Sequence, residues 1–304
     1  MNSSTSNIYT YEFFSNSNSP KGIIHISHGM AEHILRYSWL IDRFNRDGYH
    51  VIAQDHRGHG KKILNESEGF FSEVNGWGKV ISDLEILLQD TKNKYPHLKQ
   101  YLLGHSMGAW ICLKILINKN KIDGLILSGA TLIPSYLVIL LNLVSGISNY
   151  LYGGHAKNNF LYYLTFETYN KAFKPNRTKS DWISSDNTNV NDYLNDPLCG
   201  FRAPNNLWLN LSQGISETFN KNNYLNVYKD TPIYIISGKD DPFTDFGKGT
   251  KKLFNFLCKF FNNISIKIVN DARHEVFSET SKEKSYNDVL NFLSKLKWKI
   301  YCFL

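Results

Sequence analysis

One segment constrains the fold of this 304-residue chain more than any other, and it reads QYLLGHSMGAWICLKIL from Gln100 onward. A strand-like apolar run leads into Gly104-His105-Ser106-Met107-Gly108, and a helix-like apolar run follows. The chain reverses so sharply there that a side chain at 104 or 108 would strike the neighbouring strand or helix. The strain lifts the Ser106 hydroxyl above the sheet. The segment predicts a nucleophilic serine, and the plain alternative is a tight turn without chemistry.

Buried strand-like runs and helix-like runs alternate along the rest of the chain. This alternation predicts an α/β fold with a mostly parallel central sheet and helices on both faces. The expected strands are 8–14, 21–29, 49–54, 122–130, 231–238 and 264–269, and the expected helices are 84–94, 249–261 and 286–297.

About one hundred residues between Ala130 and Thr231 break the alternation. That is too long for a single crossover helix. Leu132 to Leu151 is apolar and aromatic, and the remainder is predicted to be irregular. We therefore expect a single domain over residues 1–304, with an inserted cap at residues 132–228 that folds over the ends of the strands. The alternative is a helical excursion with purely structural packing.

A serine at its ordinary pKa is a poor nucleophile, so Ser106 needs a general base and a group that orients the base. In folds with this turn the order along the chain is serine, acid, histidine. Of ten histidines only His155 and His274 follow the turn. His155 lies in the expected cap, whereas His274 follows the last expected strand and is our candidate base. The preceding strand ends in GKDDPF, so that both Asp240 and Asp241 are candidate acids.

The attack creates an oxyanion, whose charge must meet preorganised N–H donors. The amide of Met107, at the start of the helix, is one candidate. The loop HISHGMAEH supplies the other, the amide of Met30, and Gly29 lets the backbone approach closely. A solvated histidine-rich loop is the alternative.

A metal site is a weaker interpretation of the motif DHRGHG at Asp55 to Gly60. Potential ligands there are Asp55, His56 and His59, together with His28 and His33. The glycines favour a tight loop whose polar side chains bond locally, and no carboxylate-rich cluster accompanies them. We therefore predict no metal and no organic cofactor for the chemistry.

Composition narrows the function classes and the compartment. Hydrophobic residues at 42% and charged residues at 20% exclude wholesale disorder and a coiled coil. The net charge of +7 is compatible with an anionic membrane surface, but no basic cluster or module predicts nucleic-acid binding. Four cysteines without CxxC spacing predict neither a zinc site nor a disulfide framework, and they favour a reducing compartment.

The N-terminal segment and the longest apolar stretch bear on the location of the protein. The N-terminus MNSSTSNIYTYEFF has no basic region followed by an apolar region, so no secretory signal is predicted. The longest apolar stretch, Leu132 to Val144, is shorter than the ~20 residues needed to span a bilayer. We expect a cytoplasmic protein, with peripheral attachment to a membrane as an open alternative.

Five motifs in this order, SHGMAEH, DHRGHG, GHSMG, ISGKDDP and ARHE, give the chain a resemblance to a known family. It resembles the monoacylglycerol lipase and lysophospholipase branch of the α/β-hydrolases, also described as serine aminopeptidase-like, from about Gly22 to Leu293. The segments FETYNKAFKPNRTKSDWISSD, NDPLCGF and DPFTDFGKG are most similar to a bacterial-type subgroup. The loop GHGKK departs from the family in lacking the small hydroxyl residue that commonly follows DHRGHG.

The resemblance implies a triad of Ser106, Asp241 and His274, with Asp240 as the second candidate for the acid. It further implies that the amides of Met30 and Met107 bind the oxyanion. It also implies a cap that shapes an acyl-binding tunnel and touches membranes. We therefore predict a serine hydrolase that cleaves esters of single-chain lipids, monoacylglycerols or lysophospholipids, through an acyl-enzyme. The alternatives are an esterase or peptidase of small soluble substrates, an acyltransferase, and a catalytically silent hydrolase-fold binding protein. The sequence leaves the oligomeric state open.

Overall fold

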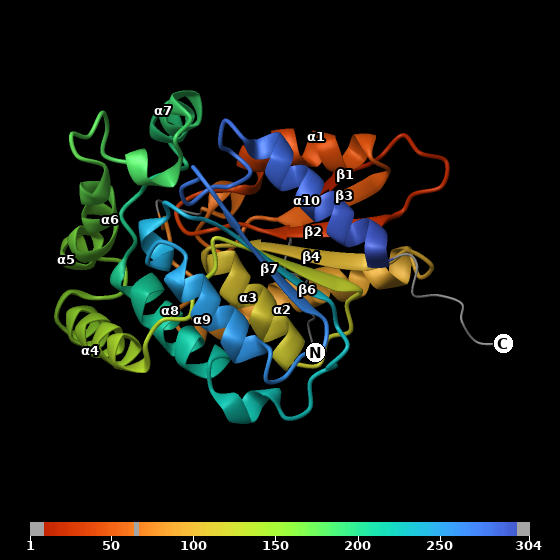
Figure 1. Cartoon of the computed structure of the whole chain (residues 1–304). Coiled ribbons are helices and arrows are strands. Elements are labelled where there is room, and N and C mark those ends of the chain that lie inside the picture. Colours follow the sequence, from red (N-terminus) through yellow and green to blue (C-terminus); the bar gives the residue numbers. More distant parts are fainter. Residues whose placement is uncertain (1–8, 64–66, 297–304) are drawn as a thin grey trace.

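The computed structural model describes residues 9–63 and 67–296, and within them a single seven-stranded sheet forms the centre of the molecule (Figure 1). The strand order is β1-β3-β2-β4-β5-β6-β7, with β1 antiparallel to β3 and all other neighbours parallel. The strands are β1 (Thr10–Phe13), β2 (Gly22–Ser27), β3 (Tyr49–Gln54), β4 (Gln100–His105), β5 (Gly124–Ser128), β6 (Ile233–Gly238) and β7 (Ile264–Val269).

The inner strands are apolar along their whole length because both faces of the sheet are covered. Every residue of β2 to β6 is buried, whereas the edge strands β1 and β7 are partly exposed. This confirms the expected mostly parallel α/β sheet. The predicted strand start at Ile8 and helix end at Lys297 lie outside the described residues.

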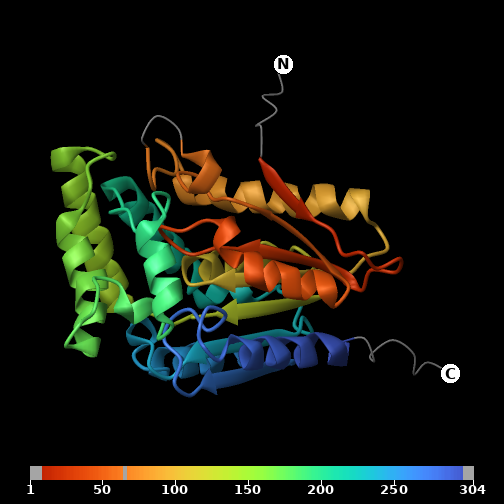
Figure 2. The same ribbon diagram turned by 90° about the horizontal axis from the view of Figure 1, so that it is seen from above.

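Helices cover both faces of the sheet, as expected (Figures 1 and 2). Two of them, α1 (Ser38–Arg46) and α10 (Lys282–Lys295), share one apolar core with the strands, and α2 (Gly76–Lys94), α3 (Met107–Ile117) and α9 (Lys248–Leu257) share the other. The sequence analysis missed α1. Its signal was present, because Leu40, Ile41 and Phe44 lie at helical spacing and all three are buried.

The helix α2 begins at Gly76, earlier than the predicted Leu84. Two glycines in its first turn obscure the start, and the structure shows what compensates for them. The side chain of Asn75 accepts a hydrogen bond from the Gly78 amide at 3.3 Å, and Asn210 accepts one from the Trp77 amide at 3.0 Å. These bonds satisfy N–H groups that have no partner within a helix.

Between β5 and β6 the chain leaves the sheet and forms a helical segment at one end of it (Figures 1 and 2). The prediction that this segment is irregular beyond Leu151 is wrong for most of its residues, which are helical, but is confirmed for residues 174–180 and 196–203. Its asparagine-rich parts fold because buried asparagine side chains bond backbone groups, as Asn206 does with the Phe71 amide at 3.2 Å. The helices are α4 (Ser135–Tyr152), α5 (Asn159–Tyr162), the π-helix η3 (Tyr163–Glu167), α6 (Thr168–Asn170), α7 (Asn187–Asn195) and α8 (Asn205–Thr218), together with the short 3-10 helices η4 (Lys171–Phe173), η5 (Asp181–Ile183) and η6 (Lys221–Tyr224).

The helix α4 is longer than the apolar stretch that was predicted to end at Val144. It has 18 residues and a mean hydropathy of 1.3, so that by length and composition alone it is long enough to cross a membrane. The prediction stopped too early because Ser145, Gly146 and Ser148 interrupt the apolar run without ending the helix. Only 11% of the helix is buried, and its buried side packs against α8.

Candidate active site

The turn between β4 and α3 holds Ser106 in a strained backbone conformation, with φ 54° and ψ −118°. A Cβ atom at Gly108 would lie 2.0 Å from the carbonyl oxygen of Ser27 in β2. One at Gly104 would lie 2.8 Å from the Cα of Ala109 in α3. Both positions therefore require glycine because neighbouring backbone fills the space, as the sequence analysis argued.

His274 and Asp241 meet at the carboxyl ends of β6 and β7. The Nδ1–H of His274 donates to Oδ2 of Asp241 at 2.9 Å, and both side chains are buried. The other carboxylate oxygen, Oδ1, accepts the amide of Phe243 at 2.9 Å, which fixes the plane of the carboxylate. Because Nδ1 carries the proton, Nε2 of His274 is left as the acceptor. Asp240 is half-buried, and its amide donates to the Ala272 carbonyl.

Charge around His274 favours its protonated form. Burial alone would lower the pKa of His274, but the charge and hydrogen bond of Asp241, with the charges of Glu275 and Glu32, raise it above 6.5. The neighbouring His105, whose ring centroid lies 4.7 Å away, behaves oppositely. Burial and then the charge of His274 lower the pKa of His105 to about 4. Of the two rings, only His274 is suited to hold a proton during catalysis near neutral pH.

A cavity of about 110 Å³ adjoins these groups. Ser106, His274, Met30 and Met107 all line it. As the first residue of α3, Met107 has an N–H without a partner inside the helix. The structure thus brings the predicted nucleophile, base and both oxyanion residues to one cavity, with the predicted acid behind the base. Most of the remaining wall is apolar and comes from Trp110, Ile133, Leu141, Phe166, Tyr169, Trp182, Ile183, Trp208, Leu211, Ile215 and Phe243.

Glu32 shapes the loop that carries Met30, and the sequence analysis assigned it no role. Its Oε1 accepts the Gly29 amide at 2.5 Å and the Tyr37 hydroxyl at 2.8 Å. A Cβ atom at Gly29 would lie 2.7 Å from the same oxygen, so that glycine is required for this contact. Ala31 adopts φ 56°, which completes the tight turn. The carboxylate of Glu32 therefore fixes the backbone from which the Met30 amide projects.

Arg36 ties this loop to the residue that follows His274. Its guanidinium donates to both carboxylate oxygens of Glu275, at 2.7 and 2.9 Å, and to Glu32 at 3.0 Å. Glu275 also accepts a hydrogen bond from Asn189 of α7 at 2.7 Å. Burial by itself raises the pKa of Glu275, but the nearby Arg36 guanidinium lowers it to about 2. The sequence analysis missed this network because Arg36 and Glu275 lie far apart in the chain.

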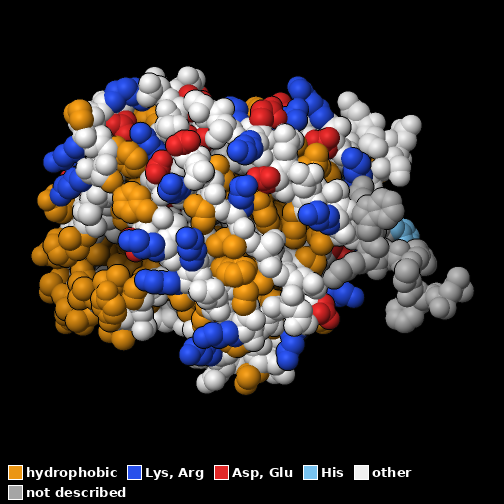
Figure 3. Space-filling view, viewed as in Figure 1, with side chains coloured by type: hydrophobic (Ala, Val, Ile, Leu, Met, Phe, Trp, Pro, Cys, Tyr) orange, Lys and Arg blue, Asp and Glu red, His pale blue; other side chains and the backbone are white. Residues whose placement is uncertain are grey.

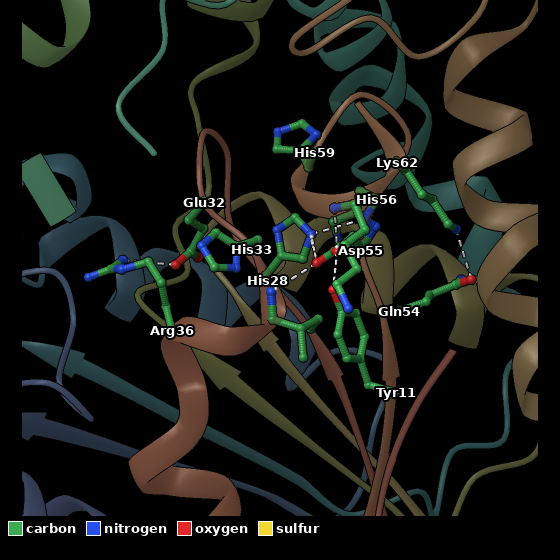
Figure 4. Close-up of polar contacts among 12 residues, drawn as sticks. Tyr11, His28, Glu32, His33, Arg36, Gln54, Asp55, His56, His59 and Lys62 are labelled. Atoms are coloured by element: carbon green, nitrogen blue, oxygen red, sulfur yellow. Dashed lines mark hydrogen bonds and ion pairs between the residues drawn. The ribbon is translucent and has the colours of Figure 1, made fainter. Parts of the chain in front are cut away.

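Of the histidines weighed as metal ligands, His28, His56 and His59 are held by hydrogen bonds within the two loops that carry them (Figure 4). His33 instead bonds through Nε2 to Asp196 at 2.7 Å. His28 bonds to the Gly29 carbonyl through Nδ1 and accepts the amide of His56 through Nε2. Asp55 accepts the amide of Ile34 at 2.9 Å. Burial lowers the pKa of His28 to about 4 and that of His59 to about 3, so that both rings are neutral near pH 7. These residues support the two loops beside the cavity.

The sheet order, the strained serine after β4 and the loops after β6 and β7 that carry Asp241 and His274 define the α/β-hydrolase fold. The family model described as "Serine aminopeptidase, S33" matches residues 18–281, and the chain belongs to this family. Both the predicted fold class and the predicted family are confirmed.

Known proteins of similar length resemble the chain along most of its residues. It is 28% identical over 266 residues to a monoglyceride lipase homolog of Monkeypox virus, covering 87% of this chain and 86% of that protein. It is 25% identical over 286 residues to a probable lysophospholipase L2 of Haemophilus influenzae, covering 88% and 82%. A thermostable carboxyl esterase from Bacillus coagulans superposes with a TM-score of 0.84 at 26% identity, covering 94% and 93%.

Proposed function

We propose that this protein is a serine hydrolase that cleaves the carboxylic ester of single-chain lipids through an acyl-enzyme. The observation that carries the proposal is the cavity, in which Ser106 and His274 adjoin a wall that is mostly apolar. Apolar walls favour an acyl chain, because its burial releases ordered water. The relatives support this substrate class, since their names refer to monoglycerides and lysophospholipids.

In the first half-reaction, Ser106 Oγ attacks the ester carbonyl while His274 Nε2 takes the hydroxyl proton. The amides of Met30 and Met107 hold the resulting oxyanion. Collapse of this intermediate breaks the bond to the alcohol, which leaves with the proton from His274. Asp241 holds the ring in place and stabilises its charged form.

In the second half-reaction, His274 removes a proton from water, and the resulting hydroxide attacks the acyl-serine. The second tetrahedral intermediate releases the fatty acid, and Ser106 regains its proton. We assign no step to a metal or an organic cofactor.

We further propose that residues 132–228 act as a cap on this cavity. Phe166, Trp182 and Trp208 from this segment line the cavity, and Trp182 lies 4.9 Å from the His274 ring between centroids. A cap built in this way excludes water from the apolar wall that would bind the acyl chain.

Active-site labelling combined with a chain-length series tests the proposal. The purified protein is treated with a fluorophosphonate probe, and release of p-nitrophenol is followed from esters of increasing acyl length. We expect labelling that is lost in Ser106→Ala, and kcat/KM that rises from short to medium or long chains, because each buried methylene contributes about 0.8 kcal/mol. Labelling with a flat or falling chain-length profile would instead favour small soluble esters. An unlabelled wild-type protein would contradict the serine mechanism.

The outward side of α4 supports a second proposal, that the protein rests on a lipid surface through this helix. Exposed apolar side chains of α4 include Ile139 at 67% and Tyr150 at 88%. They form a continuous hydrophobic area at the lower left of the molecule in Figure 3. The helix packs on α8 by its other side, so that it would lie along a membrane surface rather than cross it. The free Cys112, Cys199 and Cys258 support a reducing, cytoplasmic location.

Vesicle binding tests this contact. We expect Ile139→Glu to weaken binding to anionic phospholipid vesicles about tenfold or more, because burying one such side chain contributes at least ~1.5 kcal/mol. Leu225→Glu is a matched control, since Leu225 is equally exposed at 69% but lies outside α4. Hydrolysis of a short soluble ester should be unchanged in both variants. Equal vesicle binding by the two variants would contradict the proposal.

A further inference from the structure

Three potential metal ligands meet beside the active site, on residues that the proposed reaction does not use. The ligand atoms of His33, Asp196 and Cys199 all lie within 4.8 Å of one another. His33 follows the loop of Met30, whereas Asp196 and Cys199 follow α7. The sequence analysis considered His33 only with its neighbours in the chain, because nothing in the sequence pairs it with residues about 160 positions away.

The chemistry of the three donors suits zinc. Imidazole nitrogen, thiolate sulfur and carboxylate oxygen are the ligands that Zn²⁺ takes in proteins, at about 2.0–2.3 Å. Tetrahedral coordination at those lengths separates neighbouring ligand atoms by roughly 3.3–3.7 Å. His33 Nε2 and Asp196 Oδ2 are 2.7 Å apart. The two atoms therefore have to move apart by less than about 1 Å to admit the ion.

The surroundings hold these ligands in place and leave one side accessible. Asp196 Oδ1 accepts the Leu198 amide at 2.8 Å, which orients the carboxylate. The Asp196 side chain is 27% exposed, so that a hydrated ion can reach it and keep a water as its fourth ligand. The charge of Arg36 acts on Cys199, and the carboxylates of Glu32 and Glu275 compensate that charge.

We propose that His33, Asp196 and Cys199 bind Zn²⁺, and that the ion fastens the segment after α7 to the loop that carries Met30. The two segments already touch, since the Gly200 amide donates to the Ala31 carbonyl at 2.9 Å. Zinc takes Cys199 as the thiolate and releases its proton to solvent. In the structure His33 Nε2–H donates to Asp196 at 2.7 Å. Zinc binding therefore requires the ring to change to the tautomer with its proton on Nδ1, which leaves the Nε2 lone pair for the ion. The site holds structure together and supplies no group to ester cleavage, so it is independent of the proposed function.

Metal titration of the metal-free, full-length protein tests the site. We expect one equivalent of Zn²⁺ to bind in competition with a chelating dye, with an affinity that rises with pH because a thiol proton is released. Co²⁺ in place of zinc should show the near-ultraviolet absorption of a cobalt–thiolate bond. Cys199→Ser and Asp196→Asn should each lower the affinity by at least about tenfold, the lower end of the loss caused by outer-shell changes alone.

Two variants serve as matched controls. Cys258→Ser removes an exposed cysteine, and His155→Gln removes an exposed histidine that lies 3.7 Å from Glu73. Both should bind zinc as the wild-type protein does. Unchanged affinity in Cys199→Ser, or a wild-type cobalt complex without thiolate absorption, would overturn the proposal. The cobalt spectrum decides the matter even if a variant fails to fold.

Discussion

Replacing Ser106 by alanine is expected to lower kcat for ester hydrolysis by about 10⁶-fold, the effect of removing the serine from a serine–histidine–acid site. Without the hydroxyl there is no atom to form the acyl-enzyme, and the strained turn after β4 cannot supply another. KM should change little, because the apolar wall that binds the acyl chain is left intact. Steady-state kinetics on a p-nitrophenyl ester measures both quantities.

Three further variants make this result specific. His274→Ala should cause a loss of similar size, and the double variant should be no worse than either single one, because the two residues act as a unit. Ser72→Ala, at a half-buried residue that does not line the cavity, should retain wild-type rates. Thermal unfolding of each variant shows whether the fold is kept. Residual turnover above about a hundredth of the wild-type rate in a folded Ser106→Ala protein would rule out Ser106 as the nucleophile.

Asp241→Asn is expected to lower kcat by about 10⁴-fold, whereas Asp240→Asn should change it by no more than roughly twofold. An amide at position 241 can hold the His274 ring in the wrong tautomer and cannot stabilise its charge. Asp241 bonds to His274 at 2.9 Å. Asp240, the residue before it, is half-buried. The two substitutions remove the same charge from adjacent positions, so that each controls for the other.

A pH profile separates the proposed role of Asp241 from a merely structural one. The charge of Asp241 raises the pKa of His274, and the base works only when it is unprotonated. The rising limb of kcat/KM should therefore lie above pH 6.5 in the wild-type protein and move to lower pH in Asp241→Asn. A larger loss in Asp240→Asn, or a limb that does not move in Asp241→Asn, would contradict the assignment.

Sequence reasoning succeeded where local signals determine structure. Continuous apolar runs predicted the inner strands, and β3 begins and ends at the predicted residues, Tyr49 and Gln54. It failed where the stabilising partner is remote. The start of α2 depends on Asn210, and α8 depends on asparagine side chains that bond distant backbone groups. An asparagine-rich segment has weak helix propensity on its own, so that it reads as a loop.

In the candidate site, too, residues with a local sequence signal could be predicted and contacts between remote residues could not. Ser106, Asp241 and His274 could be proposed because each follows a recognisable strand. The ion pair between Arg36 and Glu275 could not, because it joins residues 239 positions apart and neither is conspicuous in the sequence. Glu32 was within a motif that was quoted, yet its hydrogen bond to Gly29 depends on a backbone turn that the motif alone does not reveal.

The elements that line the cavity differ in how firmly the rest of the molecule holds them. The helix α8 contributes Trp208 and Leu211 to the wall and is fastened to the core by Asn206 and Asn210. Phe166, whose ring lies 6.3 Å from that of Trp208 between centroids, comes from a run of helices only three to five residues long, α5 to α6. Short elements with exposed outer faces deform at low cost. The part of the wall around Phe166 can therefore adapt to acyl chains of different shape, while the part formed by α8 keeps its position.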